Sequence, residues 1–241
     1  MAGTKQKNII ISVISNAIIC ILIALIFIPC FNENKSIQTA NSEYHGTIYA
    51  GDKKSNKVSL MVNVYWGTES LVKMLDIFDK YDIKTTFFIG GTWAKDNSGL
   101  LKKMYESGHE IASHGNKHKE HGKLDYSANL AEIQSCHEIV KDILNIDMEL
   151  FAPPGGSYNA STIQAANYLN YKTIMWTRDT IDWRDHNTNL IYNRAVTNMS
   201  GGDLILMHPT ENTAEALEKI ICYAKKHNLS LVPVSETLGL K

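Results

Sequence analysis

The sequence predicts an α/β domain with a parallel sheet, preceded by one transmembrane helix. β-rich apolar runs alternate with segments whose apolar residues recur at the helical period of 3.6 residues. An uncharged run near the N-terminus is long enough to cross a bilayer. Alternation alone does not separate an open doubly wound sheet from a closed barrel, and both folds carry function at the carboxyl ends of their strands.

Composition excludes some classes of function. The 241 residues include 24 Lys and Arg against 25 Asp and Glu, a net charge of -1, so no basic surface for nucleic acid is indicated. Four cysteines without a recognisable spacing do not indicate a disulfide framework. The length fits one sizeable core, and one folded domain is expected.

The N-terminal segment predicts a membrane anchor. Residues 8–29 contain no charge and are rich in Ile, Leu, Val and Ala. Lys5 and Lys7 precede them, which predicts a cytoplasmic N-terminus and an extracytoplasmic remainder. A cleaved signal peptide would have a shorter apolar region, and a lipoprotein at Cys30 is a further alternative. We favour an uncleaved signal anchor over 1–31, which predicts a single-pass protein of the cell membrane.

Residues 32–56 are polar and without an apolar period, and predict an extracytoplasmic stalk. The folded domain is predicted over 57–241. Its first helix has a core face at Leu71, Met74, Leu75 and Phe78. Seven strands are expected, at 58–64, 85–89, 110–114, 150–152, 173–177, 204–208 and 229–234.

Polar residues and a proline pair follow five of these strands, namely Asn63, His114, Pro153 with Pro154, Asp179 and His208. Parallel strands place their carboxyl ends at one face, so these residues should converge. This convergence is the main indication of function.

His114 and His118 are separated by three residues just after a strand, a spacing that can present both imidazoles to one metal ion. A solvated histidine-rich loop is an equally good interpretation, because His109 and His121 lie in the same region. The spacing alone leaves both open.

Three other segments are ambiguous by themselves. Asp179, Asp182 and Trp183 form an acidic loop after a strand, and His208 precedes Pro209, which ends its strand. The run 151–159 joins two prolines to two glycines and fits a tight turn.

In order, however, the segments 109–118, 179–183 and 206–208 resemble the motifs of the polysaccharide deacetylase (NodB-homology, carbohydrate esterase 4-like) family. The resemblance covers the chain from about residue 57 to 240. It implies a distorted (β/α) barrel of seven strands, similar to a TIM barrel.

The resemblance also implies a chemistry. His114 and His118 would hold a divalent metal such as zinc, which activates a water for attack on an N-acetyl carbonyl. His208 would be the general acid, and Asp179 or Asp182 would have to supply the base. The implied substrate is N-acetylated cell-wall polysaccharide, either peptidoglycan or a chitin-like glycan, contacted by Trp66, Pro154, Gly155, Tyr158 and Trp183.

The first motif departs from the family pattern, whose Thr-Phe-Asp-Asp falls here on 61–64. Asn63 replaces the base and Val64 the anionic metal ligand. Ala152 stands where the family has an Arg that pairs with the base. Losing both partners avoids stranding one buried charge, which would cost about 3–5 kcal/mol. Two hypotheses follow: a deacetylase with an altered site, or a catalytically impaired paralogue that binds wall glycan.

Overall fold

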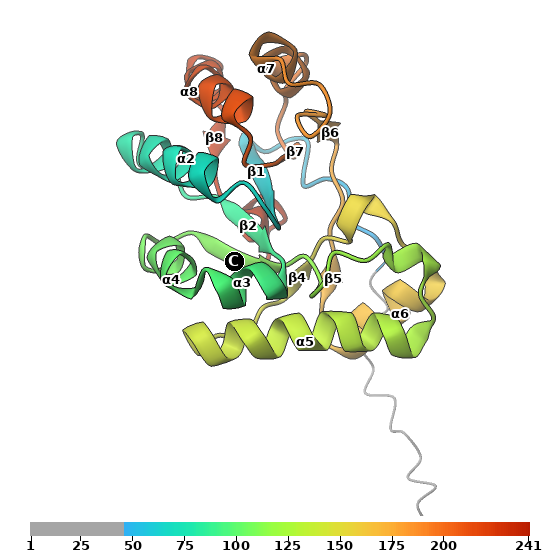
Figure 1. Cartoon of the computed structure of the whole chain (residues 1–241). Helices are drawn as coiled ribbons and strands as arrows, with labels where there is room; N and C mark the ends of the chain where they lie inside the picture. The colour runs from blue at the N-terminus through green and yellow to red at the C-terminus, as the bar shows by residue number, and fades with distance from the viewer. Residues whose placement is uncertain (1–45) are drawn as a thin grey trace, which may run out of the picture. The chain divides into compact units, whose positions relative to one another are not determined.

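The structure is a computed structural model that describes residues 46–241, and Figure 1 shows strands enclosed by helices. All pairings between the named strands are parallel. The strands of this part of the chain are β1 (Lys57–Val64), β2 (Thr86–Ile89), β3 (Glu110–Ser113), β4 (Leu150–Phe151), β5 (Lys172–Thr173), β6 (Arg178–Asp179), β7 (Leu204–Met207) and β8 (Ser230–Leu231). Their order is β5-β4-β3-β2-β1-β7-β6, with β8 paired to β1.

The predicted distorted (β/α) barrel of seven strands was wrong, because the sheet is an open half-barrel with β5 and β6 at its edges. Of the single strand predicted at 173–177, only Thr173 lies in a strand, β5, and the remaining residues connect it to β6. Ile174 N–H still donates to Phe151 O beside β4, whereas Thr177 N–H donates to Leu204 O beside β7. The backbone connects the two edges of the sheet, but no ladder of hydrogen bonds joins β5 to β6. The apolar pattern could not reveal this gap in the sheet, because it does not show which strands pair.

The fold prediction also included a transmembrane helix. No helix within 46–241 combines the length and hydropathy needed to cross a bilayer. The predicted segment, 8–29, lies outside the described residues. For the part of the chain that the structure describes, the fold is therefore an open α/β half-barrel without a membrane-spanning helix.

Helices cover the outer face of the sheet (Figure 1). The predicted core face of the first helix is confirmed, since its four apolar residues are all buried. The helices are α2 (Thr68–Lys80), α3 (Gly91–Asp96), α4 (Ser98–Glu106), α5 (Tyr126–Leu144), α6 (Ala160–Tyr168), α7 (Thr188–Val196), α8 (Glu211–Lys226) and α9 (Val234–Thr237), with short 3₁₀ turns η1 (His121–Lys123) and η2 (Pro154–Gly156).

Strand β1 shows how the half-barrel divides its core. Val62 and Val64 belong to the large cluster between sheet and helices, while Met61 belongs to the smaller inner cluster. Side chains alternate along a strand, so Asn63 points to the same side as Met61. The first motif thus places Asn63 toward the interior and Val64 toward the helices.

Residues before β1 pack beside the edge strand β5. Ile48 N–H donates to Thr173 O at 2.9 Å, and Met175 N–H donates to Ile48 O at 2.8 Å. The hydroxyls of Tyr49 and Tyr158 are hydrogen-bonded at 2.8 Å. Part of the segment predicted as a stalk therefore contacts the sheet, while the domain boundaries stay a prediction.

Candidate functional site

A cavity of about 480 Å³ opens at the carboxyl ends of the strands. Polar and aromatic side chains from several loops meet there, as the sequence predicted for that end of a parallel sheet. Its lining residues are Asn63, Trp66, His118, Gly155, Trp176, Asp179, Trp183, Leu206 and His208.

Asn63 lies at the end of β1 and is 4% exposed. Its side-chain oxygen is buried and has no hydrogen-bond partner in the protein. A buried polar atom left unpaired costs about 1–3 kcal/mol. The Asn63 side-chain oxygen is therefore an unused hydrogen-bond acceptor in a residue that lines the cavity.

His114 and His118 come together after β3, with ring centroids 5.1 Å apart and planes at 65°. Nδ1 of the buried His114 lies 2.8 Å from Ala152 O. A carbonyl can only accept, so Nδ1 carries the proton and Nε2 keeps its lone pair. His118 adopts a left-handed backbone, φ 52°, which turns its ring into the cavity wall.

Both imidazoles are held neutral. Burial, followed by the neighbouring His118, holds the pKa of His114 well below its usual range. Loss of solvent also lowers the pKa of His118, and nearby His208 adds to the effect. The pair thus presents lone pairs and not positive charge at neutral pH.

His208 is fixed by the carboxylate of Asp182, which is fully buried. Asp182 Oδ1 lies 2.8 Å from His208 Nδ1, and Oδ2 accepts the His208 backbone N–H at 2.6 Å. Thr213 Oγ1 donates to the same Oδ2 at 2.6 Å. The carboxylate therefore orients the His208 ring and leaves its Nε2 toward the cavity.

The loops after β1 and β7 pack tightly. The Trp66 and His208 rings are stacked, 5.9 Å apart at an angle of 7°. Gly67 has φ 79°, and a Cβ there would stand 2.1 Å from Pro209 O. Only glycine allows this approach, which brings Trp66 beside His208.

Asp179 and Trp183 also line the cavity. Asp179 Oδ1 accepts the Ile181 N–H at 2.8 Å, which stabilises the turn after β6. Trp183 is 51% exposed and Trp66 is 42% exposed. Two indole rings are thus available at the cavity.

Four predicted site residues do not line the cavity. His114 is buried behind His118, Asp182 lies behind His208, Pro154 is buried in η2, and Tyr158 bonds Tyr49.

Two lining residues, Trp176 and Leu206, were not predicted from the sequence. Alternation along the strand could have found Leu206, because it shares a side with His208. Trp176 lies in the crossing between β5 and β6, which sequence reasoning treated as one strand.

The residues do not fit a complete catalytic metal site, which normally has three protein ligands. Val64, at the position where the family resemblance implies the anionic ligand, is buried and belongs to the helix-facing core. Within residues 46–241, no group of three or more His, Cys, Asp or Glu is arranged to hold a metal ion. Two imidazoles remain as potential metal ligands.

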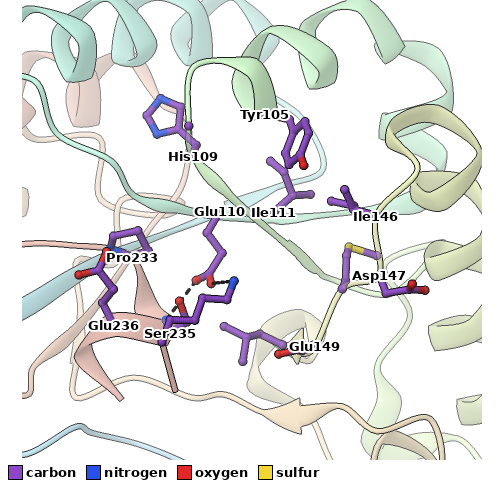
Figure 2. A pocket seen from close by; sticks show the side chains of 14 residues that line it. Tyr105, His109, Glu110, Ile111, Ile146, Asp147, Glu149, Pro233, Ser235 and Glu236 are labelled. Atoms are coloured by element: carbon purple, nitrogen blue, oxygen red, sulfur yellow. Dashed lines mark hydrogen bonds and ion pairs between the residues drawn. The ribbon is translucent and has the colours of Figure 1, made fainter. Parts of the chain in front are cut away.

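A second cavity, of about 530 Å³, lies at the other end of the strands, where β3 and β4 begin (Figure 2). Its central carboxylate, Glu110, already accepts hydrogen bonds from Thr86 Oγ1 at 2.7 Å and from Ser235 N–H at 3.1 Å. Lys241 Nζ lies 3.5 Å away. Glu110 thus holds the C-terminal segment against the sheet.

Comparison with known proteins identifies the class. The polysaccharide deacetylase family model matches residues 50–174. A peptidoglycan-N-acetylglucosamine deacetylase of Bacillus cereus is 32% identical over 184 residues, covering 70% of this chain and 82% of that protein. The chain therefore belongs to the polysaccharide deacetylase family.

Two further relatives are similar over most of the chain. The chain is 36% identical to an uncharacterized Bacillus subtilis protein, YlxY, over 79% of its own length and 60% of that protein's. It also resembles the crystal structure of a carbohydrate esterase family 4 pseudoenzyme from Bacillus anthracis, with TM-score 0.78, 32% identity and coverage of 80% of this chain and 69% of that one. A mutant of this pseudoenzyme with restored enzymatic activity aligns equally well, at TM-score 0.78 and 30% identity.

Proposed function

We propose that this chain binds N-acetylated cell-wall glycan in the cavity at the strand ends, and that its deacetylase activity is impaired. The observation that carries the proposal is the neutral, unpartnered Asn63 in place of the base, in a cavity that keeps exposed indole rings. Relatives named as peptidoglycan deacetylases support a wall glycan as the ligand.

The aromatic rings supply the binding surface. Trp66 and Trp183 offer flat apolar faces, which suit the apolar faces of sugar rings. Arg184 lies 6.0 Å from the Trp183 ring and helps to hold it. Both rings keep a large exposed fraction, so a ligand can bury them without unfolding any element.

Impaired hydrolysis follows from the groups at the site. An amide has no appreciable basicity, so Asn63 cannot accept the proton of an attacking water. The carboxylate of Asp182 is used to hold His208 and is fully buried. Asp179 is the carboxylate that lines the cavity, and one of its oxygens holds the Ile181 N–H.

Binding and chemistry are tested together. Calorimetry with N-acetylglucosamine oligomers should give saturable binding that Trp66→Ala weakens about tenfold, while exposed Tyr168→Ala on α6 does not. Acetate release from the same oligomers should stay at background. Absence of binding to both oligomers and purified peptidoglycan would refute the proposal.

A second candidate function is slow deacetylation by an altered site, favoured by the intact His208–Asp182 pair. Here His208 Nε2 would hold the proton that the departing sugar amine needs. Acetate release by the unchanged protein, abolished by His208→Ala, would establish it. Zinc content at one equivalent, lost in a His114→Ala, His118→Ala variant, would show that two imidazoles suffice for the metal.

Asn63→Asp with Ala152→Arg tests the joint loss of base and partner. Acetate release by this double variant would show that the joint loss alone impairs hydrolysis. Its absence would mean that a further replacement, such as Val64 at the position of the anionic ligand, also prevents it.

We further propose an extracytoplasmic location, where the wall glycan is. Protease treatment of intact, wall-stripped cells should degrade the domain and spare a cytoplasmic marker. Protection of the domain would contradict this location.

A further inference from the structure

Asn63 is the buried polar group of the cavity that the protein itself leaves unpaired at Oδ1. Two other polar side chains of the cavity are already held, since His208 is bound to Asp182 and Asp179 to the Ile181 N–H. Asn63 lies on a regular strand, in register with Phe88 of β2, so its backbone position is fixed. A rigid, desolvated amide facing a cavity is suited to ligand recognition, because its hydrogen bonds are gained without prior reorganisation.

The chemistry of the amide indicates which ligand group it prefers. A primary amide offers one acceptor and two donors, and a secondary acetamide offers one N–H and one C=O. Asn63 can therefore accept from the acetamide N–H and donate to its carbonyl. A carboxylate in the same place could only accept, and would favour the ammonium group of a deacetylated sugar.

The surroundings agree with an acetyl group. Leu206 and Trp176 contribute apolar surface to the same cavity, which suits a methyl group. Asp179 acts in the opposite direction, because its carboxylate attracts the ammonium group of a deacetylated sugar. Any preference for the acetylated sugar should therefore be limited in size and should depend on Asn63.

We propose that Asn63 reads the acetylation state of the glycan, so that the cavity binds N-acetylated sugars in preference to their amine forms. This inference rests on the proposed glycan-binding function. It gives the replacement of the carboxylate a positive role: a residue that would remove the acetyl group becomes one that recognises it.

The test is calorimetric titration with the N-acetylglucosamine tetramer and with its fully deacetylated counterpart, below neutral pH so that the amines are protonated. Unchanged protein should bind the acetylated tetramer about tenfold tighter or more, as expected for one or two hydrogen bonds. Asn63→Leu should lose most of this difference by weakening the acetylated ligand. Asn63→Asp should reduce or reverse it by strengthening the deacetylated ligand.

The controls separate the possible failures. Asn63→Leu should not lower the thermal midpoint, because Asn63 Oδ1 has no partner to lose. Trp66→Ala should weaken both ligands equally. Equal affinity of the unchanged protein for the two tetramers, or a preference that survives Asn63→Leu, would overturn this inference and leave glycan binding intact. Binding of neither would refute the proposed function itself.

Discussion

At the scale of single residues, the contact between Asp182 and His208 determines the form of the cavity wall. Asp182 accepts three hydrogen bonds, two of them from His208. Asn in its place would turn an NH₂ group toward one of these donors. We expect Asp182→Asn to lower the free energy of unfolding by about 2–3 kcal/mol.

Urea unfolding measures this loss, and nitrogen NMR should show a changed His208 tautomer. Exposed Asp76→Asn on α2 is the matched control and should stay within about 0.5 kcal/mol of the unchanged protein. An unaltered His208 spectrum in Asp182→Asn would contradict the orienting role.

His109 should make stability depend on pH. Burial lowers the pKa of His109 to about 4, and Lys84 adds to the effect while Asp79 opposes it. Between about pH 6.5 and this value the unfolded chain binds a proton that the folded one does not. The stabilisation is complete above that range and is lost as the pH falls through it, by up to about 3 kcal/mol.

Unfolding free energies at several pH values check this dependence. His109→Phe should flatten the curve, although it leaves the Thr85 N–H without its acceptor. Phe78→Leu, which alters the ring against His109, should lower stability while keeping the slope. If the unfolding free energy of His109→Phe depended on pH as strongly as that of the unchanged protein, other groups would be responsible. His121 is one such group, because burial also lowers its pKa.

Several site residues were predictable from the sequence because strand ends converge. Asn63, His118, Asp179 and His208 all line one cavity. The order of the motifs could not show that Asp182 lies behind His208. The same sequence is compatible with an Asp182 side chain that faces the cavity and with one that faces His208. Nor could it show that Asn63 Oδ1 lacks a partner, since that depends on side chains from other strands.

At the scale of elements, helix α5 positions the loop that carries His118. Glu132 Oε2 accepts the Lys117 N–H at 2.8 Å, and Oε1 pairs with Lys119 Nζ at 3.1 Å. The two neighbours of His118 are thus held by one buried carboxylate. Burial alone would raise the pKa of Glu132, but these hydrogen bonds outweigh it and lower the pKa overall.

Removing this carboxylate should loosen the loop. We expect Glu132→Ala to speed amide hydrogen exchange over 115–123 by about tenfold or more, because the left-handed His118 loses both flanking contacts. Mass spectrometry of exchanged fragments measures it. Glu132→Gln keeps one acceptor and should give an intermediate rate, while fragments of α8 should not change. A uniform increase across the chain would indicate general destabilisation instead.

The elements themselves were predicted unequally well. The core face of α2 was readable because its period is regular and its residues are buried. Strand β6 was not, since Arg178 and Asp179 are only two residues with no apolar pattern. Arg178 is held there by Asp203 at 2.8 Å, a contact that sequence spacing does not reveal.

At the scale of the whole described domain, closure of the sheet was the main error. Alternating strands and helices are common to open and closed sheets. What distinguishes them is whether the two edge strands of the sheet pair with each other, and β5 and β6 do not.

The edge of β5 is covered by the segment before β1. Ile48 provides this cover through its N–H and through packing on the inner cluster. We expect Ile48→Pro to lower the free energy of unfolding by about 2 kcal/mol, because the N–H to Thr173 O is lost. Exposed strand edges pair with other chains, so light scattering should also show concentration-dependent association.

Ile48→Val is the matched control for that substitution. It keeps the N–H and should cost only about 0.5–1.5 kcal/mol, without association. Similar association in both variants would mean that apolar packing, and not the covered edge, keeps the domain monomeric.

Lys241, which pairs with Glu110, and the aromatic cavity lie at different ends of the strands. Lys241 lies where the strands begin, whereas the aromatic cavity opens where they end. The Lys241 side chain is 65% exposed, and ion pairs of such exposed side chains contribute little to stability. A surface to which the domain is coupled through the Lys241 side chain would therefore lie at the other end of the strands from the aromatic cavity, which would face the solution.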